Sequence, residues 1–127
     1  MEHCEVVDML GATIVSISGM QDESEAVIFT AQDGRSWHMW YQPDCCARCY
    51  IVQIDGDVQD LIGSPLLMSE EISNEGASAP EGYYESYTWT FYKFATIKGY
   101  VTLRWLGSSN GYYSESVSFA RVAPDMN

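Results

Sequence analysis

The sequence predicts a mainly β protein, with α+β as the alternative: an antiparallel meander that forms a curved sheet or partly open barrel. Three observations support this prediction. Runs of β-branched and aromatic residues recur along the chain, turn-forming pairs such as Asp33-Gly34 and Asn110-Gly111 separate them, and apolar and polar residues alternate in the C-terminal third. Residues 57–62 are the best candidate for a short helix.

The first 42 residues are predicted to contain three strands. Residues 12–19 (ATIVSISG), 26–30 (AVIFT) and 36–42 (SWHMWYQ) are rich in residues that favour extended backbone. The last two runs flank Asp33-Gly34, and glycine accepts the positive φ of a tight turn. We therefore expect a β-hairpin at this position.

The middle of the chain is less regular. Residues 49–54 are expected to form a fourth strand, and residues 57–62 a short helix with Asp57 as its N-terminal cap. Residues 66–72 (LLMSEEI) are too few to distinguish a strand from a helix by periodicity. Residues 74–85 (NEGASAPEGYYE) have no period and many turn-forming residues, which predicts an exposed loop.

The C-terminal third predicts a three-stranded antiparallel meander with one apolar face. Its strands are expected over residues 87–97, 101–105 and 113–122, with turns at Lys98-Gly99 and at residues 107–111 (GSSNG). Burying a large apolar side chain contributes roughly 1.5–3 kcal/mol before its entropy cost, so this face is expected to organise the core. The residues expected on it are Trp89, Phe91, Val101, Leu103, Trp105, Val117 and Phe119.

Length and charge limit the classes of function. The 127 residues (14.3 kDa) are predicted to form a single domain, 1–127. No apolar run is long enough for a membrane helix, and residues 1–8 lack the pattern of a secretory signal. A net charge of −12 repels phosphates. We therefore expect neither a membrane nor nucleic acid as a direct partner.

The negative charge is concentrated before Lys93. Residues 1–92 contain sixteen acidic and two basic residues, a balance of −14, whereas residues 93–127 contain two acidic and four basic residues, a balance of +2. Such asymmetry indicates an interaction surface rather than a fold. The carboxylates that we expect to bind a partner are those of Asp22, Glu23, Glu25, Glu70, Glu71, Glu75, Glu81 and Glu85.

The cysteines have a spacing found in metal sites. Cys46 and Cys49 form a Cys-x-x-Cys motif beside Cys45, which matches half of a zinc site. A second pair of ligands at the usual spacing is missing, and buried side chains and reduced thiols explain the same residues more simply. We therefore predict no cofactor and no catalytic residue. A small metal- or thiol-dependent enzyme that uses Cys45, Cys46 and Cys49 is kept as an alternative.

Several short runs carry a resemblance to one family. They include Asp33-Gly34-Arg35, Asp44-Cys45-Cys46, residues 60–65 (DLIGSP), residues 86–93 (SYTWTFYK) and residues 107–115 (GSSNGYYSE). Through these runs the chain resembles, over most of residues 10–119, a family of small uncharacterised proteins encoded by tailed bacteriophages and prophages. The resemblance implies an accessory protein in the cytoplasm of an infected bacterium, and it implies no assigned activity.

The resemblance and the acidic region together predict a phage-encoded accessory protein that binds and inhibits a host protein. Its carboxylates would take the place of DNA phosphates in the basic channel of a nucleic-acid-handling defence protein, as in an anti-CRISPR inhibitor. The alternatives are the metal- or thiol-dependent enzyme and a phage structural or assembly protein.

Overall fold

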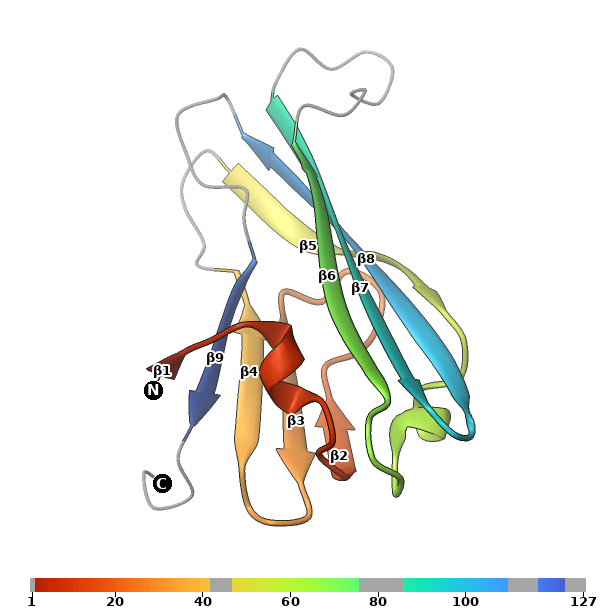
Figure 1. Cartoon of the computed structure of the whole chain (residues 1–127). Coiled ribbons are helices and arrows are strands. Elements are labelled where there is room, and N and C mark those ends of the chain that lie inside the picture. The colour runs from red at the N-terminus through yellow and green to blue at the C-terminus, as the bar shows by residue number, and fades with distance from the viewer. Residues whose placement is uncertain (1, 42–46, 76–85, 110–116, 123–127) are drawn as a thin grey trace.

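The computed structural model describes residues 2–41, 47–75, 86–109 and 117–122. In these ranges two antiparallel sheets face each other and do not close into a barrel, which confirms the mainly β prediction (Figure 1). The helical residues described form two short 3-10 turns. The elements in chain order are β1 (Glu2–His3), η1 (Val6–Met9), β2 (Ile14–Ser18), β3 (Ala26–Ala31), β4 (Ser36–Trp40), β5 (Ala47–Asp55), η2 (Val58–Leu61), β6 (Met68–Glu75), β7 (Ser86–Thr96), β8 (Gly99–Ser109) and β9 (Ser118–Val122).

The first sheet has five strands in the order β1-β9-β4-β3-β2. Its β3 and β4 form the hairpin that the sequence predicts around Asp33-Gly34. Gly34 has a φ of 93°, and Asp33 Oδ1 accepts a hydrogen bond from the Arg35 backbone N–H at 3.1 Å. The turn therefore uses the two properties for which this pair is favoured, a positive φ and a local side-chain acceptor.

The second sheet has four strands in the order β5-β8-β7-β6. Its centre is a long hairpin in which β7 pairs with β8 from Ser86 opposite Ser109 to Thr96 opposite Gly99. The chain reverses between Thr96 and Gly99, as the sequence predicts. The strands β5 and β6 consequently form the two edges of this sheet.

The predicted short helix over residues 57–62 is present as the 3-10 turn η2. The Asp57 carboxylate accepts a hydrogen bond from the Gln59 backbone N–H at 2.9 Å, which is the predicted N-terminal cap. Gly63 follows with a φ of 89° and redirects the chain toward β6.

The undecided segment, residues 66–72, leads into and forms part of β6. This strand also includes Asn74 and Glu75, which pair with Trp89 and Thr88. The predicted loop over residues 74–85 therefore begins two residues too early, because cross-strand pairing extends the strand beyond its apolar part. Residues 76–85 lie outside the described residues.

The predicted C-terminal meander is wrong in its third strand. Residues 118–122 do form β9, but β9 pairs with β4 and β1 in the five-stranded sheet. Phe119 lies opposite Met39 and packs into the core. Alternation of apolar and polar residues identifies a strand but not its partner, so the crossover from one sheet to the other has no local signal.

The predicted apolar face is wrong for β7. The predicted residues of β8 are buried, namely Val101, Leu103 and Trp105. Their antiparallel partners in β7 are Phe94, Tyr92 and Thr90. Opposite residues of an antiparallel pair point to the same side, so these partners also face the core. Trp89 and Phe91 therefore lie on the outer face, although both are only partly exposed.

The core fills the space between the two sheets. Phe29 of β3 and Phe94 of β7 meet there, with ring centroids 5.4 Å apart. At one side the segment η1 inserts the buried side chains of Val6 and Met9. This insertion places η1 beside β6, and the two elements form the walls of the candidate site.

Candidate functional site

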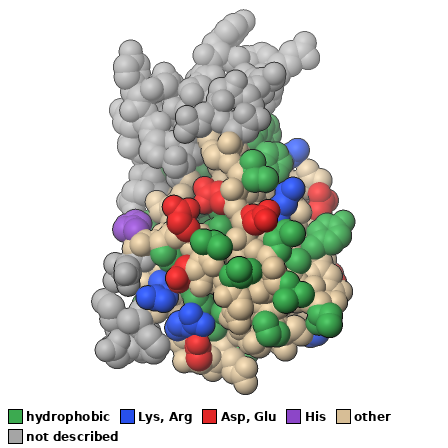
Figure 2. Space-filling view, in the orientation of Figure 1, with side chains coloured by type: hydrophobic (Ala, Val, Ile, Leu, Met, Phe, Trp, Pro, Cys, Tyr) green, Lys and Arg blue, Asp and Glu red, His purple; other side chains and the backbone are tan. Residues whose placement is uncertain are grey.

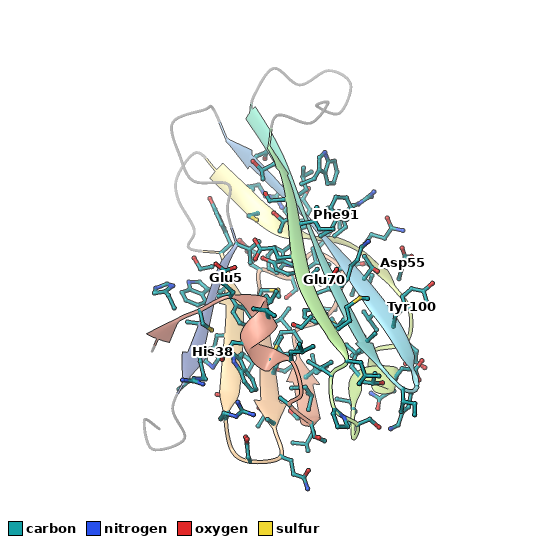
Figure 3. The ribbon with its side chains drawn as sticks, in the orientation of Figure 1. Glu5, His38, Asp55, Glu70, Phe91 and Tyr100 are labelled. Carbon is teal, nitrogen blue, oxygen red and sulfur yellow. The ribbon has the colours of Figure 1, made fainter. Side chains whose placement is uncertain are left out.

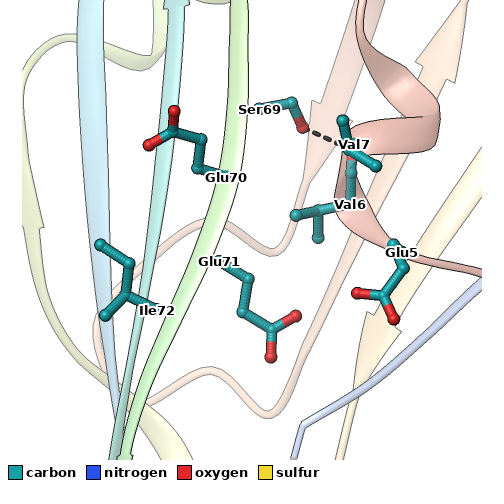
Figure 4. A pocket seen from close by; sticks show the side chains of 7 residues that line it. All are labelled: Glu5, Val6, Val7, Ser69, Glu70, Glu71 and Ile72. Carbon is teal, nitrogen blue, oxygen red and sulfur yellow. Dashed lines mark hydrogen bonds between the residues drawn. The ribbon is translucent and has the colours of Figure 1, made fainter.

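A groove of about 340 Å³ runs between η1 and the edge strand β6 (Figure 4). It combines carboxylates with apolar side chains. On the space-filling view, acidic side chains gather on the face where η1 and β6 meet (Figure 2). The residues that line the groove are Glu5, Val6, Val7, Ser69, Glu70, Glu71 and Ile72.

The walls of the groove are fixed by contacts between segments far apart in sequence. The buried hydroxyl of Ser69 donates a hydrogen bond to the Val6 carbonyl at 2.5 Å. Next to this contact, the Gly11 N–H donates to the Leu66 carbonyl at 2.9 Å, and the Leu66 N–H donates to the Ala12 carbonyl at 2.9 Å. These bonds hold η1 at a defined distance from β6, so the groove is formed before any partner arrives.

Two carboxylates point toward the same space. Glu5 extends from the start of η1 and Glu71 from the core-facing side of β6, and their carboxylates converge (Figure 4). Partial burial raises the pKa of Glu71, and the nearby charge of Glu5 raises it further. Within the described residues, no Lys or Arg forms an ion pair with Glu5, Glu70 or Glu71. The groove therefore concentrates negative charge that the described residues leave uncompensated.

A buried phenol lies next to this pair. Tyr92 is the cross-strand neighbour of Glu71, and its side chain is fully buried. Its hydroxyl has no hydrogen-bond partner among the described residues. Burial raises the pKa of Tyr92 well above its usual range, and the charges of Glu71, Cys49 and Glu5 act in the same direction. A polar atom without a partner is costly in a protein interior.

The outer face of the four-stranded sheet carries a different group of side chains. The guanidinium carbon of Arg104 lies 4.9 Å from the Trp89 ring centroid, and that of Arg48 lies 4.6 Å from the Tyr50 ring centroid. Phe91, beside them, points away from the five-stranded sheet (Figure 3). These pairs explain why Trp89 is only partly exposed although it lies outside the core.

The predicted acidic residues do not come together. Asp22, Glu23 and Glu25 lie in the connection between β2 and β3. This connection contacts β5, since the Glu23 N–H donates to the Ile51 carbonyl at 2.8 Å and the Ile51 N–H donates to the Ser24 carbonyl at 2.9 Å. Because β5 and β6 are opposite edges of one sheet, these three residues are separated from Glu70 and Glu71 by two intervening strands.

The remaining predicted carboxylates are only partly placed. The backbone of Glu75 ends β6, opposite Thr88. Glu81 and Glu85 lie outside the described residues. Glu5, which lies across the groove from Glu71, is not among the residues predicted from the sequence. Its one signal is its position directly before the apolar run of residues 6–10 (VVDML), and nothing in that run indicates the distant strand it contacts.

The predicted cysteine cluster is described only in part. Cys49 lies in β5 with 1% of its surface exposed and belongs to the hydrophobic core. Cys45 and Cys46 lie outside the described ranges. In the part of the chain that is described, no group of three or more His, Cys, Asp or Glu side chains is placed to hold a metal ion. The position of Cys49 favours a packing role for this residue.

The fold and the groove define a two-sheet β protein with an acidic edge. A family model described as a domain of unknown function, DUF7448, matches residues 7–119, so the chain belongs to this family. No curated protein and no solved structure matches the chain. Among the described residues, no helix is long and apolar enough to cross a membrane.

Proposed function

We propose that the protein is a phage-encoded accessory protein that binds and inhibits a host protein, and that the groove between η1 and β6 receives a positively charged part of that partner. The observation that carries this proposal is the pair of converging carboxylates of Glu5 and Glu71 in a preformed groove, which form no ion pair with a Lys or Arg of the described residues. A Lys or Arg side chain entering the groove would meet two converging carboxylates and apolar walls.

The energetics of Glu71 support a cationic partner. A carboxylate that is partly removed from water and lies near a second carboxylate is destabilised in its charged form, as the raised pKa of Glu71 indicates. An arriving cation relieves both effects, because it offsets the repulsion from Glu5 and replaces the lost hydration with charged hydrogen bonds. Binding of a cation is therefore favoured, because it removes the unfavourable free energy of the ionised Glu71 in the unbound protein.

The overall charge supports the same class of partner. At a net charge of −12, the protein attracts basic surfaces and accelerates their association, while it repels nucleic acid itself. Basic channels that normally hold nucleic acid are common targets for such a surface. This argument, with the resemblance to phage-encoded proteins, supports a nucleic-acid-handling host defence protein as the target.

A plating assay tests this function. Bacterial strains, each carrying one CRISPR or restriction system, would express the wild-type protein, a groove variant or a control variant, and would then be challenged with a sensitive phage. The groove variant carries Glu5→Gln, Glu70→Gln and Glu71→Gln. The control carries Asp22→Asn, Glu23→Gln and Glu25→Gln, which changes the net charge equally at the opposite edge of the sheet.

In at least one strain, the wild type and the control should restore plaque formation, and the groove variant should not. The purified wild-type protein should then inhibit the matching nuclease less effectively as salt rises. Restoration in no strain, or equal restoration by the groove variant and the wild type, would contradict the proposal.

A further inference from the structure

The sheet edges of the described chain differ in their protection against further strand pairing. The edge strand β1 has two residues. The edge strands β2 and β5 contain register shifts, between Ile14 and Ser16 in β2 and between Ile51 and Gln53 in β5. Short edge strands and bulges both disfavour the addition of another strand. The fourth edge, β6, has eight residues and pairs with β7 in unbroken register.

The composition of β6 restricts which strand can pair with its edge. Its sequence, MSEEISNE, contains no Pro, and all of its charged residues are glutamates. Two of them are Glu70 and Glu71. Two copies of β6 paired with each other would bring these like charges together, which disfavours self-association and favours a cationic strand.

We propose that an extended, cationic segment of the partner adds to the edge of β6 as a further strand of the four-stranded sheet. This inference rests on the proposed function and specifies how the groove holds its partner. Main-chain hydrogen bonds supply affinity in this mode of recognition, and side chains at alternate positions supply specificity.

The two faces of β6 define the side chains that such a segment needs. Glu71 lies on the core-facing side, near Glu5, whereas Glu70 lies on the outer side, where its cross-strand neighbour is Lys93. Side chains of an added strand alternate between these two sides. Cations at every second position are therefore directed toward Glu71 and Glu5, where the negative charge is uncompensated.

The surroundings of Glu71 fit a cation followed by an apolar residue. Glu71 meets Glu5 across the groove, and neither carboxylate forms an ion pair with a Lys or Arg of the described residues. Val7 on one wall and Ile72 on the other are 56% and 47% exposed. Ile72 lies on the outer side of β6 with Glu70, so it matches the uncharged side chains that the added strand places between its cations.

Two synthetic peptides separate strand addition from simple charge attraction. Both have nine residues with Lys at every second position and Thr between. In the second peptide every backbone amide nitrogen is methylated, which keeps the charge but removes the main-chain donors. Binding of each peptide to the full chain would be measured by calorimetry at low salt, and its position by amide exchange in β6.

We expect the unmethylated peptide to bind about tenfold or more tightly than the methylated one, because two or more main-chain hydrogen bonds are lost on methylation. Amides at alternate positions of β6 should become protected from exchange. The combined variant Glu5→Gln/Glu71→Gln should weaken the binding of both peptides.

Other outcomes distinguish this inference from the proposed function. Equal binding of both peptides, still reduced by Glu5→Gln/Glu71→Gln, would overturn strand addition and leave the cation-binding groove in place. Protection confined to another strand would overturn it in the same way. Binding of neither peptide would count against the groove itself.

Discussion

The two edge strands of the four-stranded sheet, β5 and β6, both have carboxylates beside them. They differ in the main-chain contacts and the register of each strand. At β5, main-chain groups of Ile51 bond with the connection between β2 and β3, and a register shift follows directly after this residue. At β6 the register is unbroken, and the groove beside the strand holds Glu5 and Glu71 near each other. The β5 edge is closed at Ile51 by the chain itself, whereas the β6 edge faces η1 across the charged groove.

This difference separates two roles for acidic residues in one molecule. The carboxylates near β5 belong to an exposed turn. Those at β6 lie in a preformed groove where one carboxylate is partly buried, so their charge is costly unless a cation binds. A net charge alone does not identify such a site, but the raised pKa of Glu71 does.

The largest expected effect compares an isoleucine from each edge. Ile51→Ala removes a fully buried side chain from β5 and should destabilise the protein by about 2–5 kcal/mol. Ile72→Ala removes a side chain that is 47% exposed on β6 and should cost less than about 1 kcal/mol. Urea unfolding measures both. Ile51 faces the core and Ile72 lies on the outer face, so similar losses would show that Ile72 packs more tightly than its exposure indicates.

The next effect concerns the contact that holds η1 beside β6. Ser69→Ala removes the donor to the Val6 carbonyl and should destabilise the protein by about 1–3 kcal/mol, because a buried carbonyl loses its partner. Amide exchange in η1 should quicken more than in η2. Ser73→Ala, an exposed change on the same strand, is the control and should lie within about 0.5 kcal/mol of the wild type. Equal effects of the two changes would refute the anchoring role of Ser69.

A smaller effect is expected at the closed edge. Glu23 has a φ of 67°, a left-handed conformation that strains a residue with a Cβ atom. Glu23→Gly should therefore stabilise the protein by about 0.5–1 kcal/mol, after the greater entropy of glycine in the unfolded chain is included. Glu23→Gln removes the same charge without relieving the backbone. If both variants gain stability equally in thermal unfolding, charge and not backbone strain is the cause.

The features that the sequence predicts correctly depend on neighbouring residues. The hairpin at Asp33-Gly34 and the cap at Asp57 each use a side-chain acceptor and a backbone donor two residues later. Such contacts form in the same way wherever the segment lies in the fold. Local chemistry was therefore sufficient for them.

The wrong and missing features depend on distant residues. Both odd and even positions of β7 are apolar enough to be buried, and the register with β8 selects Tyr92 and Phe94 over Trp89 and Phe91. Glu5 and Glu71 approach each other only because η1 packs on a strand more than sixty positions later. The pairing of β7 with β8 identifies the buried face of β7. No pattern within a single strand indicates the groove.

The smallest expected change in stability tests whether the negative charge of Glu71 destabilises the folded protein. The pKa of Glu71 is raised in the folded protein by burial and then by Glu5, so the folded state binds a proton more readily than the unfolded chain. Stability should therefore fall as the pH rises through the folded-state pKa of Glu71. Thermal unfolding at several pH values should show Glu71→Gln as the more stable protein near neutral pH. This advantage should disappear below the ordinary pKa of a glutamate, where both states are protonated.

The second carboxylate makes this test specific. Glu5→Gln removes the smaller of the two causes, so it should lower the pKa of Glu71 only in part and should reduce the stabilisation gained from Glu71→Gln in the double variant. Additive effects would show that the two carboxylates do not interact. If they do interact, the same substitution that stabilises the unbound protein should weaken its binding to a cationic segment. Glutamate at both positions is then explained by the partner and not by the fold, which is the distinction between the β6 edge and the β5 edge.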